Sequence, residues 1–269
     1  MLKGNVSNLV RNLGLLHNAD YARYFFQKLV NYRANQRFKL NFPDLALPPD
    51  YLIYESFQLH YQKYYFGGLD TASWLKSLLY KHLQINEVKI LDWGCGPGRI
   101  IRHLPDLMGS HNQFYGTDVN ANSIDWCTNY LPKIKFNNNN IAAKLPYAND
   151  FFDVIYGISI FTHLSEQSHF EWFNELNRIL KPGGIMLLTT QGNNFESKLT
   201  SKELQQFRLN QIVVRGNVRE GHRVYSAFHP VGFIQNLFKE YILLEHITRS
   251  SGDQAYLPQD VWIIRKRTP

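Results

Sequence analysis

The chain has 269 residues, of which 44% are hydrophobic and 14% are aromatic. This is enough for a sizeable core in one domain, or in one domain with an appendage. No apolar run approaches the roughly 20 residues that span a bilayer. The formal charge of +7 fits solubility first and an acidic partner second, but the basic residues are scattered, which argues against a nucleic-acid-binding protein.

The cysteines and the N-terminus predict a cellular location. Cys95 and Cys127 fit no metal-binding spacing, so we expect neither a metal nor a disulfide. The first residues lack the apolar segment of a signal peptide. We therefore expect a cytoplasmic protein with no membrane partner, and the sequence leaves its oligomeric state open.

Residues 1–83 predict a helical N-terminal extension or cap, because they contain no convincing alternating strand. Apolar residues recur at spacings of three and four over Val6–Leu16 and over Tyr21–Tyr32. In the second segment, the spacing predicts a buried stripe made of Tyr21, Phe25, Leu29 and Tyr32.

The rest of the extension is rich in prolines and aromatic residues. The prolines of residues 42–49 predict a linker or a wrapped arm. An aromatic segment, Tyr51–Phe66, then runs into Gly67 and Gly68, which we interpret as a hinge. A helix over Thr71–Leu83 follows.

Residues 84–269 predict a second region, because strand and helix patterns alternate from there on. This alternation is typical of a Rossmann-like, doubly wound α/β fold with a mostly parallel sheet. We expect strands at Val88–Trp93, Gln113–Asp118, Ile134–Asn137, Phe152–Ser159, Ile185–Gln191, Ile242–Thr248 and Asp260–Arg265. We expect helices at Arg99–Leu104, Ser123–Tyr130, Glu166–Leu180 and Val231–Lys239, and a polar, less regular insertion over about 192–231.

A glycine loop follows the first of these strands. Gly94, Gly96 and Gly98 occupy alternate positions, and Arg99 stands where a dinucleotide-binding fingerprint would have its third glycine. Such a loop allows a ligand to approach the backbone closely. Asp118 ends the next strand, where a carboxylate can accept hydrogen bonds from a ribose diol. The alternative for Asp118 is a cap of the following helix.

At this point the chain resembles the class I S-adenosylmethionine-dependent methyltransferases. The resemblance rests on Ile90–Arg99, Tyr115–Asp118, Leu145–Tyr156 and Leu180–Thr189, in that order. It implies a seven-stranded sheet whose last strand is antiparallel, S-adenosylmethionine as methyl donor and S-adenosylhomocysteine as product. It also implies donor-binding roles for Asp92, Gly94, Cys95, Gly96, Gly98, Arg99, Asp118, Val119, Asn120, Asn140, Ile141 and Ser159.

The acceptor side carries no fixed motif. In this family the loop after the fourth strand, residues 157–164, lies beside the methyl group. It lacks both the Asn-Pro-Pro-Tyr motif of nucleobase amino-methylation and a Pro-Cys pair for pyrimidine methylation. His163 is the first candidate base, and a packed, non-catalytic histidine is the alternative.

Two other segments are candidates for the acceptor wall. The insertion offers His222 and His229 as further bases and Glu220, Arg223 and Tyr225 as acceptor contacts. The alternative interpretation of the insertion is an ordered surface hairpin. Tyr61 and Tyr65 of the aromatic segment are the other candidates, and core packing is their alternative.

We therefore expect a methyltransferase that methylates a small polar acceptor at oxygen, such as a sugar, a glycan precursor or a secondary metabolite. An RNA or protein methyltransferase is the first alternative. A non-catalytic partner subunit that binds S-adenosylmethionine is the second, and the intact glycine loop argues against lost cofactor binding.

Overall fold

The computed structural model describes residues 16–84, 86–216, 218, 220–248 and 259–268. Internal contacts divide the described chain into two compact units, Leu16–Asn139 and the residues from Asn140 onward. The helix predicted over Val6–Leu16 lies outside the described residues except for its last one. Across the described ranges, no helix combines the length and apolarity needed to cross a membrane.

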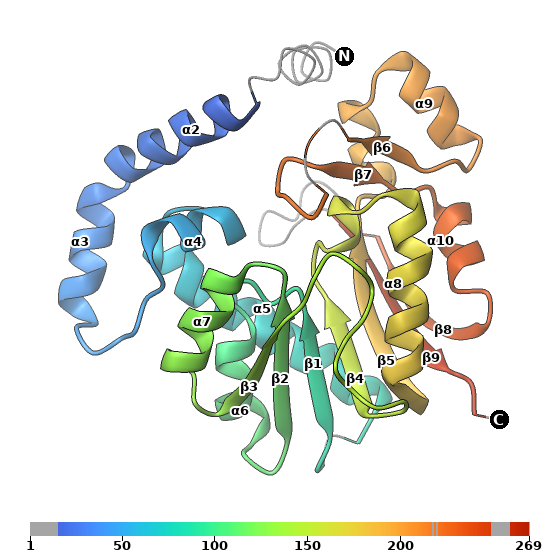
Figure 1. Cartoon of the computed structure of the whole chain (residues 1–269), viewed down its shortest axis with the longest axis horizontal. Coiled ribbons are helices and arrows are strands. Elements are labelled where there is room, and N and C mark those ends of the chain that lie inside the picture. The colour runs from blue at the N-terminus through green and yellow to red at the C-terminus, as the bar shows by residue number, and fades with distance from the viewer. Residues whose placement is uncertain (1–15, 85, 217, 219, 249–258, 269) are drawn as a thin grey trace. The chain divides into compact units, whose positions relative to one another are not determined.

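The strands form a seven-stranded sheet in the order β3-β2-β1-β4-β5-β9-β8 (Figure 1). Strand β9 is antiparallel to both of its neighbours, whereas β1, β2 and β3 pair in parallel, as do β4 and β5. This order confirms the predicted Rossmann-like α/β fold with its last strand antiparallel. The strands are β1 (Lys89–Trp93), β2 (Gln113–Asp118), β3 (Ile134–Asn138), β4 (Phe152–Gly157), β5 (Leu180–Thr190), β8 (Tyr241–Ile247) and β9 (Asp260–Lys266).

The first unit joins β1–β3 to helices that precede and connect them. The helices are α2 (Leu16–Val30), α3 (Tyr32–Asn41), α4 (Asp50–Ser56), α5 (Tyr61–His82), α6 (Leu104–Met108), α7 (Ala121–Tyr130) and a 3₁₀ turn η1 (Ile101–His103). An aromatic cluster holds the first four of these helices together, with Tyr24 and Phe38 packed among Tyr54, Tyr61 and Tyr64. The predicted helical extension is therefore confirmed, and its core is largely aromatic.

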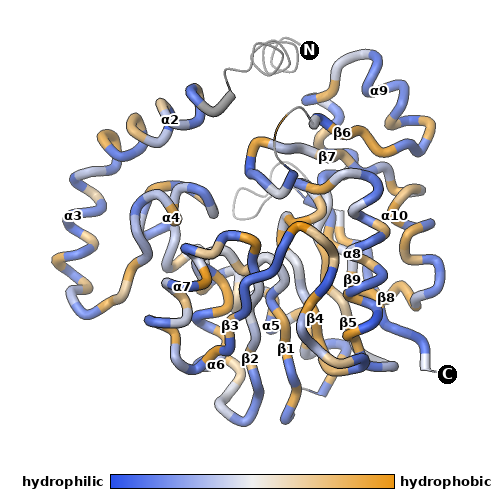
Figure 2. The backbone as a smooth tube through the Cα atoms, in the orientation of Figure 1, coloured by the Kyte–Doolittle hydropathy of each residue, from blue (hydrophilic) through white to orange (hydrophobic). Residues whose placement is uncertain are grey.

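The predicted buried stripe on α2 is wrong. Tyr21, Phe25, Leu29 and Tyr32 are all exposed, while Tyr24 is the aromatic residue of α2 that is buried. The buried face of α2 also carries polar anchors, since the Gln27 side chain accepts a hydrogen bond from the Leu59 amide at 2.9 Å. Along α2, the tube of Figure 2 alternates between orange and blue segments.

The predicted hinge at Gly67 and Gly68 is also wrong, because α5 runs through both glycines without a break. Gly68 serves close packing instead. A Cβ atom at this position would lie 2.2 Å from the carbonyl oxygen of Arg99. The glycine therefore lets α5 approach the chain immediately after the glycine loop.

Residues 42–49 contain a turn at Pro43 and Asp44 and otherwise no helix or strand, and they wrap onto the same unit as the arm that their prolines predicted. The Arg102 guanidinium donates a hydrogen bond to the Ala46 carbonyl at 2.9 Å. Leu45 and Leu47 pack against the aromatic cluster. After the glycine loop, a 3₁₀ turn and then the short α6 replace the single helix predicted from Arg99. Pro105 stands in the first turn of α6, where a missing N–H costs nothing.

The second unit contains β4, β5, β9 and β8. Strand β5 begins at Leu180, several residues before the predicted start, and its register with β4 shifts between Phe152 and Val154. Gly183 has φ +77°, which suits this irregular stretch. The other elements are η2 (Phe161–His163), α8 (Glu166–Ile179), η3 (Asn193–Lys198), α9 (Ser201–Arg208), β6 (Val213–Arg215), β7 (Ser226–Phe228) and α10 (Val231–Leu237).

The insertion is more ordered than its polar sequence suggests. Strands β6 and β7 form an antiparallel hairpin. A small core of its own joins the hairpin to η3 and α9, and it consists of Phe195, Leu199, Phe207, Val213 and Phe228. Arg215 and Glu203 add a mostly buried ion pair at 2.8 Å between β6 and α9.

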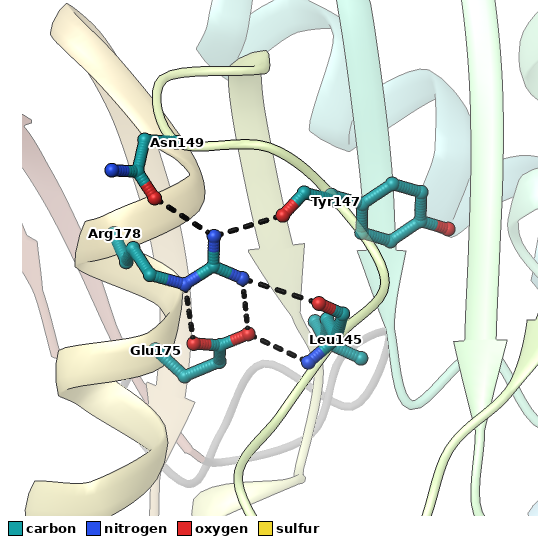
Figure 3. A network of polar contacts seen from close by, with 5 residues as sticks. All are labelled: Leu145, Tyr147, Asn149, Glu175 and Arg178. Carbon is teal, nitrogen blue, oxygen red and sulfur yellow. Dashed lines mark hydrogen bonds and ion pairs between the residues drawn. The ribbon is translucent and has the colours of Figure 1, made fainter.

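A polar network ties α8 to the segment that leads into β4 (Figure 3). The Glu175 carboxylate accepts hydrogen bonds from the Leu145 amide at 2.6 Å and from the Arg178 guanidinium at 2.7 and 2.8 Å. Arg178 also donates to the carbonyls of Tyr147 and Leu145 and to the Asn149 side chain. The network fixes the chain before β4, and β4 leads into the loop that carries His163.

Candidate functional site

The glycine loop follows β1 and is fastened to the end of β2. The amides of Gly94 and Cys95 both donate to the Thr117 carbonyl, at 2.8 and 3.0 Å. Gly94, Gly96 and Gly98 all have positive φ, between 52° and 77°, a region that side chains disfavour. A Cβ atom at Gly98 would lie 2.7 Å from the Leu131 side chain, so this position also lacks room. The loop is therefore a tight backbone turn that only glycines form easily.

Asp118 braces this loop with its carboxylate. One oxygen accepts a hydrogen bond from the Gly96 amide and the other from the Asn120 amide, both at 2.8 Å. Burial raises the pKa of Asp118, and the amide hydrogen bonds oppose that shift. Each carboxylate oxygen can accept more than one hydrogen bond. The side chain can therefore hold the loop and still accept hydroxyl donors.

Asp92, at the end of β1, and Cys95, within the loop, are both buried. Burial, together with the charges of Asp92 and Asp118, raises the pKa of the Cys95 thiol well above its ordinary value. The thiol therefore stays protonated and is no nucleophile at neutral pH. Its Sγ atom would lie 3.0 Å from a Cβ atom at Gly116, so it also fills space against β2.

Helix α5 also contacts the loop. The fully buried Tyr64 hydroxyl donates to the Pro97 carbonyl at 2.7 Å. The Arg99 guanidinium lies 4.9 Å from the centre of the Phe57 ring and 3.4 Å from the Gly67 carbonyl. Arg99 thus contacts the N-terminal helices of its own unit.

The loop after β2 meets α4 through a contact that the sequence did not indicate. The Asn120 side chain caps α7 by accepting from the Ser123 amide, and it donates to the Glu55 carboxylate at 3.0 Å. Val119 beside it is 41% exposed, which leaves an apolar surface next to Asp118. Glu55 is 65 residues away in sequence, and no local pattern marks it.

The asparagine run divides into structural and exposed positions. Asn139 is buried, and its side chain accepts from the Thr117 hydroxyl at 2.7 Å. Asn140, the predicted adenine contact, is exposed and begins the second unit. The Ile141 carbonyl accepts from the Trp172 indole at 3.1 Å, which holds the next residue in place.

In the second unit, Ser159 lies two residues after the end of β4 and has a strained backbone conformation, with φ +67°. Its amide donates to the Thr189 hydroxyl at 2.7 Å, and its hydroxyl donates to Gln259 at 3.0 Å. Thr189 donates to the same Gln259 oxygen. Ser159 is therefore locked to the carboxyl end of β5 and the start of β9, and this strain explains why β4 ends at Gly157, before its predicted end.

The insertion is pinned to the loop after β4 by three contacts. The Gly221 amide donates to the His163 carbonyl at 2.9 Å, and the Ser165 amide donates to the Glu220 carboxylate at 2.6 Å. The His163 Nδ1 atom lies 2.8 Å from the Tyr225 carbonyl. The sequence predicted both segments as site candidates, and the structure brings them together.

The third contact fixes the tautomer of His163. A carbonyl oxygen only accepts hydrogen bonds, so Nδ1 carries the proton and Nε2 keeps its lone pair. Burial lowers the pKa of His163, which keeps the ring neutral. The residue as a whole is nevertheless only partly buried. This is a neutral imidazole with a proton-accepting nitrogen.

His229 lies elsewhere, in a buried pair with His169. The two Nε2 atoms are 2.9 Å apart, His229 Nδ1 accepts from the Gln191 amide, and His169 Nδ1 lies 2.6 Å from the Ser165 carbonyl. Burial lowers the pKa of both rings, to about 4 for His169. Both nitrogens of His229 are engaged within the fold. His222 and Arg223 lie on the partly exposed segment between Gly221 and Tyr225.

The two tyrosines predicted as acceptor contacts lie in the aromatic region of the first unit. Tyr61 is buried, and its hydroxyl donates to Asp50. Tyr65 packs its ring edge-on against His103, with centroids 4.8 Å apart, and the Arg102 guanidinium lies 5.1 Å from the same ring. Among the described residues, no group of three or more histidine, cysteine or acidic side chains is placed to hold a metal.

Two observations fit a donor with a ribose and an amino-acid portion. The loop lacks a Cβ atom where such a ligand would pass. Around Gly96 there is also room, because a Cβ atom built at this position would have the Ser56 Cβ atom as its nearest neighbour, at 3.6 Å. A fixed carboxylate, Asp118, stands beside it. The glycine loop, Asp118 and the seven-stranded sheet are the features that this chain shares with the class I S-adenosylmethionine-dependent methyltransferases.

Comparison with known proteins agrees with this class. Residues 90–184 match the methyltransferase domain family. A tRNA (carboxymethyluridine(34)-5-O)-methyltransferase from Arabidopsis thaliana is 29% identical over 126 residues, which is 46% of this chain and 29% of that protein. A phosphoethanolamine N-methyltransferase from Plasmodium falciparum is 29% identical over 127 residues, which is 46% of this chain and 45% of that protein. The chain thus spans less than half the length of these curated relatives.

The fold is also similar to that of solved structures. A SAM-dependent methyltransferase from Methanosarcina mazei aligns with a TM-score of 0.55 at 20% identity, over 71% of this chain and 98% of that one. A protein from Pyrococcus horikoshii aligns with a TM-score of 0.56 at 18% identity, over 77% and 96%. These similarities confirm the fold, and the family match confirms the resemblance on which the predicted domain rests.

Proposed function

We propose that this chain transfers a methyl group from S-adenosylmethionine to a small polar acceptor at oxygen. The observation that carries the donor half is the Asp118 carboxylate, fixed by two amide hydrogen bonds beside a glycine loop. In this proposal Asp118 accepts the ribose hydroxyls and Asp92 lies near the donor ammonium. Val119 and Asn120, with Asn140 and Ile141, contact the adenine. The donor supplies an activated sulfonium, so the protein mainly aligns the reactants.

The acceptor half of the proposal rests on His163. A hydroxyl must lose its proton when it is methylated, and a base must be neutral to take it. His163 fits this role because its tautomer leaves Nε2 as the acceptor and its lowered pKa keeps the ring neutral. Glu220, Arg223 and Tyr225 are then the acceptor wall, and His222 is the second candidate base.

The relatives differ in what their names say they methylate. One is named for an oxygen of a tRNA nucleoside, one for the nitrogen of phosphoethanolamine, and a 30% identical relative from Gibberella zeae for a carbon of a sterol. An RNA acceptor is therefore the second candidate, favoured by the first of these names. We also propose a cytoplasmic location, which the two buried, unpaired cysteines support.

The donor proposal is tested by calorimetric titration with S-adenosylhomocysteine. Asp118→Ala should weaken binding by about a hundredfold, because it removes hydrogen bonds to a charged group and frees the loop. Asp125→Ala, an exposed acidic residue of α7, is the matched control and should bind like the wild type. Unchanged affinity in Asp118→Ala would refute the assignment.

The acceptor is identified by labelled-methyl transfer to cell extracts separated into small molecules, RNA and protein. Label in the small-molecule fraction supports the proposal, and label in RNA supports the second candidate. With the acceptor in hand, His163→Gln should lower kcat more than tenfold with little change in donor affinity. His111→Gln, on an exposed loop before β2, is the control.

A further inference from the structure

The outward face of α2 is unusually apolar for an exposed helix. Tyr21, Phe25 and Leu29 follow one another at four-residue spacing, and Phe26 and Val30 form the neighbouring row, so the five side chains share one side of the helix. Their exposed fractions are 55%, 48%, 77%, 65% and 63%. Isolated exposed apolar residues are ordinary, but a contiguous patch on one helix marks an interaction surface.

Positive charge borders this apolar face. The segment of α2 and α3 contains a single acidic residue, Asp20, which accepts a hydrogen bond from the Tyr54 hydroxyl at 2.7 Å. The basic residues of the same segment are Arg23, Lys28, Arg33, Arg37 and Lys39. On α2 itself, Arg23 and Lys28 flank the apolar rows, one on each side, because about 100° separates successive residues around the axis. Lys28 also forms an ion pair with Asp50 at 3.0 Å, so the positive charge on its side is partly neutralised and Arg23 supplies more of the positive charge that borders this face.

An anionic lipid surface fits this combination best. An interfacial helix buries aromatic and aliphatic side chains at the level of the headgroups, while flanking arginine and lysine side chains reach the lipid phosphates. A second copy of this chain would bring the same basic residues against each other. An RNA would pair with the charges but would leave Leu29 and Val30 against a polar backbone.

We propose that the outward face of α2, made of Tyr21, Phe25, Phe26, Leu29 and Val30, docks this protein on the surface of a membrane that contains anionic lipids. This is peripheral binding, and α2 with its 15 residues lies in the interface. The proposal is independent of the donor site and of the acceptor. It revises the expectation of no membrane partner.

The test is co-sedimentation of the full chain with two kinds of vesicle. One kind is phosphatidylcholine alone, and the other replaces a third of it with phosphatidylglycerol. The wild type should sediment with the anionic vesicles, release from them at high salt, and stay largely in solution with the neutral ones. Leu29→Glu combined with Phe26→Glu should weaken anionic binding by about a hundredfold.

A matched control and two further measurements keep the test decisive. Leu209→Glu introduces the same charge at a 71% exposed leucine after α9 and should leave vesicle binding unchanged. S-adenosylhomocysteine titration shows whether each variant still folds and separates this proposal from the proposed function. In the wild type, anionic vesicles should slow amide hydrogen exchange over 16–30 and leave α9 unaffected.

Three results would overturn the proposal. The first is equal sedimentation of the wild type and the double variant. The second is a dimer in light scattering that the double variant dissociates, because the face would then serve a second copy. The third is retention of RNA that the double variant abolishes while vesicle binding is absent.

Discussion

Two adjacent glycines in α5 should respond in opposite ways to the same substitution. At Gly68 an added Cβ atom would lie 2.2 Å from the Arg99 carbonyl oxygen and 3.2 Å from its carbon, whereas at Gly67 nothing lies within 4 Å. Both positions are helical. Gly67→Ala and Gly68→Ala therefore share every effect on the unfolded chain and on helix propensity, and they differ in the folded contact alone.

The expected magnitudes follow from these contacts. Alanine is better than glycine in a helix interior by about 0.5–1 kcal/mol, so Gly67→Ala should raise the free energy of unfolding by that amount. At Gly68 the same gain is offset by an overlap with backbone atoms, which cannot rotate away. Overpacking of this kind costs about 1–3 kcal/mol or more. Gly68→Ala should therefore be less stable than Gly67→Ala by about 2 kcal/mol or more.

Urea denaturation of the two variants measures this difference, and titration with S-adenosylhomocysteine shows where the strain goes. Arg99 directly follows Gly98, so the displaced backbone belongs to the glycine loop. Gly68→Ala should weaken donor binding, and Gly67→Ala should leave it unchanged. Equal stability of the two variants, or a Gly68→Ala protein that is more stable than the wild type, would refute the close approach of α5 to the loop.

Three further outcomes follow from buried polar groups. Acidification from about pH 6.5 toward pH 4 should lower the free energy of unfolding by up to about 1.4 kcal/mol per pH unit per histidine, because the unfolded chain binds protons that the buried pair of His169 and His229 excludes. In denaturation curves measured across this pH range, His169→Phe should flatten the slope. The control variant His111→Gln should keep it. In the same assay, Arg178→Lys should lower the free energy of unfolding by about 2 kcal/mol, because an ammonium cannot donate to the Glu175 carboxylate and to two carbonyls together. Arg208→Lys, at an exposed ion pair, should cause no measurable loss. Tyr64→Phe should weaken S-adenosylhomocysteine binding about tenfold in calorimetry by releasing the Pro97 carbonyl, and Tyr80→Phe on the exposed side of α5 should match the wild type.

The donor side could be predicted from the sequence because its signals are local. Gly94, Gly96 and Gly98 occupy alternate positions of one short segment, and Asp118 follows at the end of the next strand. Strands and turns can be predicted from residues that are adjacent in the sequence. The Glu55 contact with Asn120 could not be predicted in this way, because it depends on how α4 packs, and a single glutamate in a helix carries no mark of its partner.

The insertion shows a second limit of pattern reading. Residues 192–231 are mostly polar, which predicted an irregular segment, yet Phe195, Phe207 and Phe228 are spaced widely enough that no short window shows a core. They meet because β6 and β7 pair and α9 packs on them. The same long-range pairing places Glu220 at the start of α8, where a carboxylate is favoured by the free amides of a helix N-terminus.

The α2 stripe shows that periodicity tells which residues share a face but not whether that face is covered. Both faces of α2 carry aromatic residues, so apolar burial alone does not decide how the helix is rotated. Polar anchors decide it. Gln27 accepts from the Leu59 amide, and Asp20 accepts from the buried Tyr54 hydroxyl. A half-turn roll that buried Phe25 and Leu29 would leave these donors without partners at a cost of about 1–3 kcal/mol each. The outward orientation of the apolar rows is therefore selected by hydrogen bonds, and this orientation keeps the rows available to a partner.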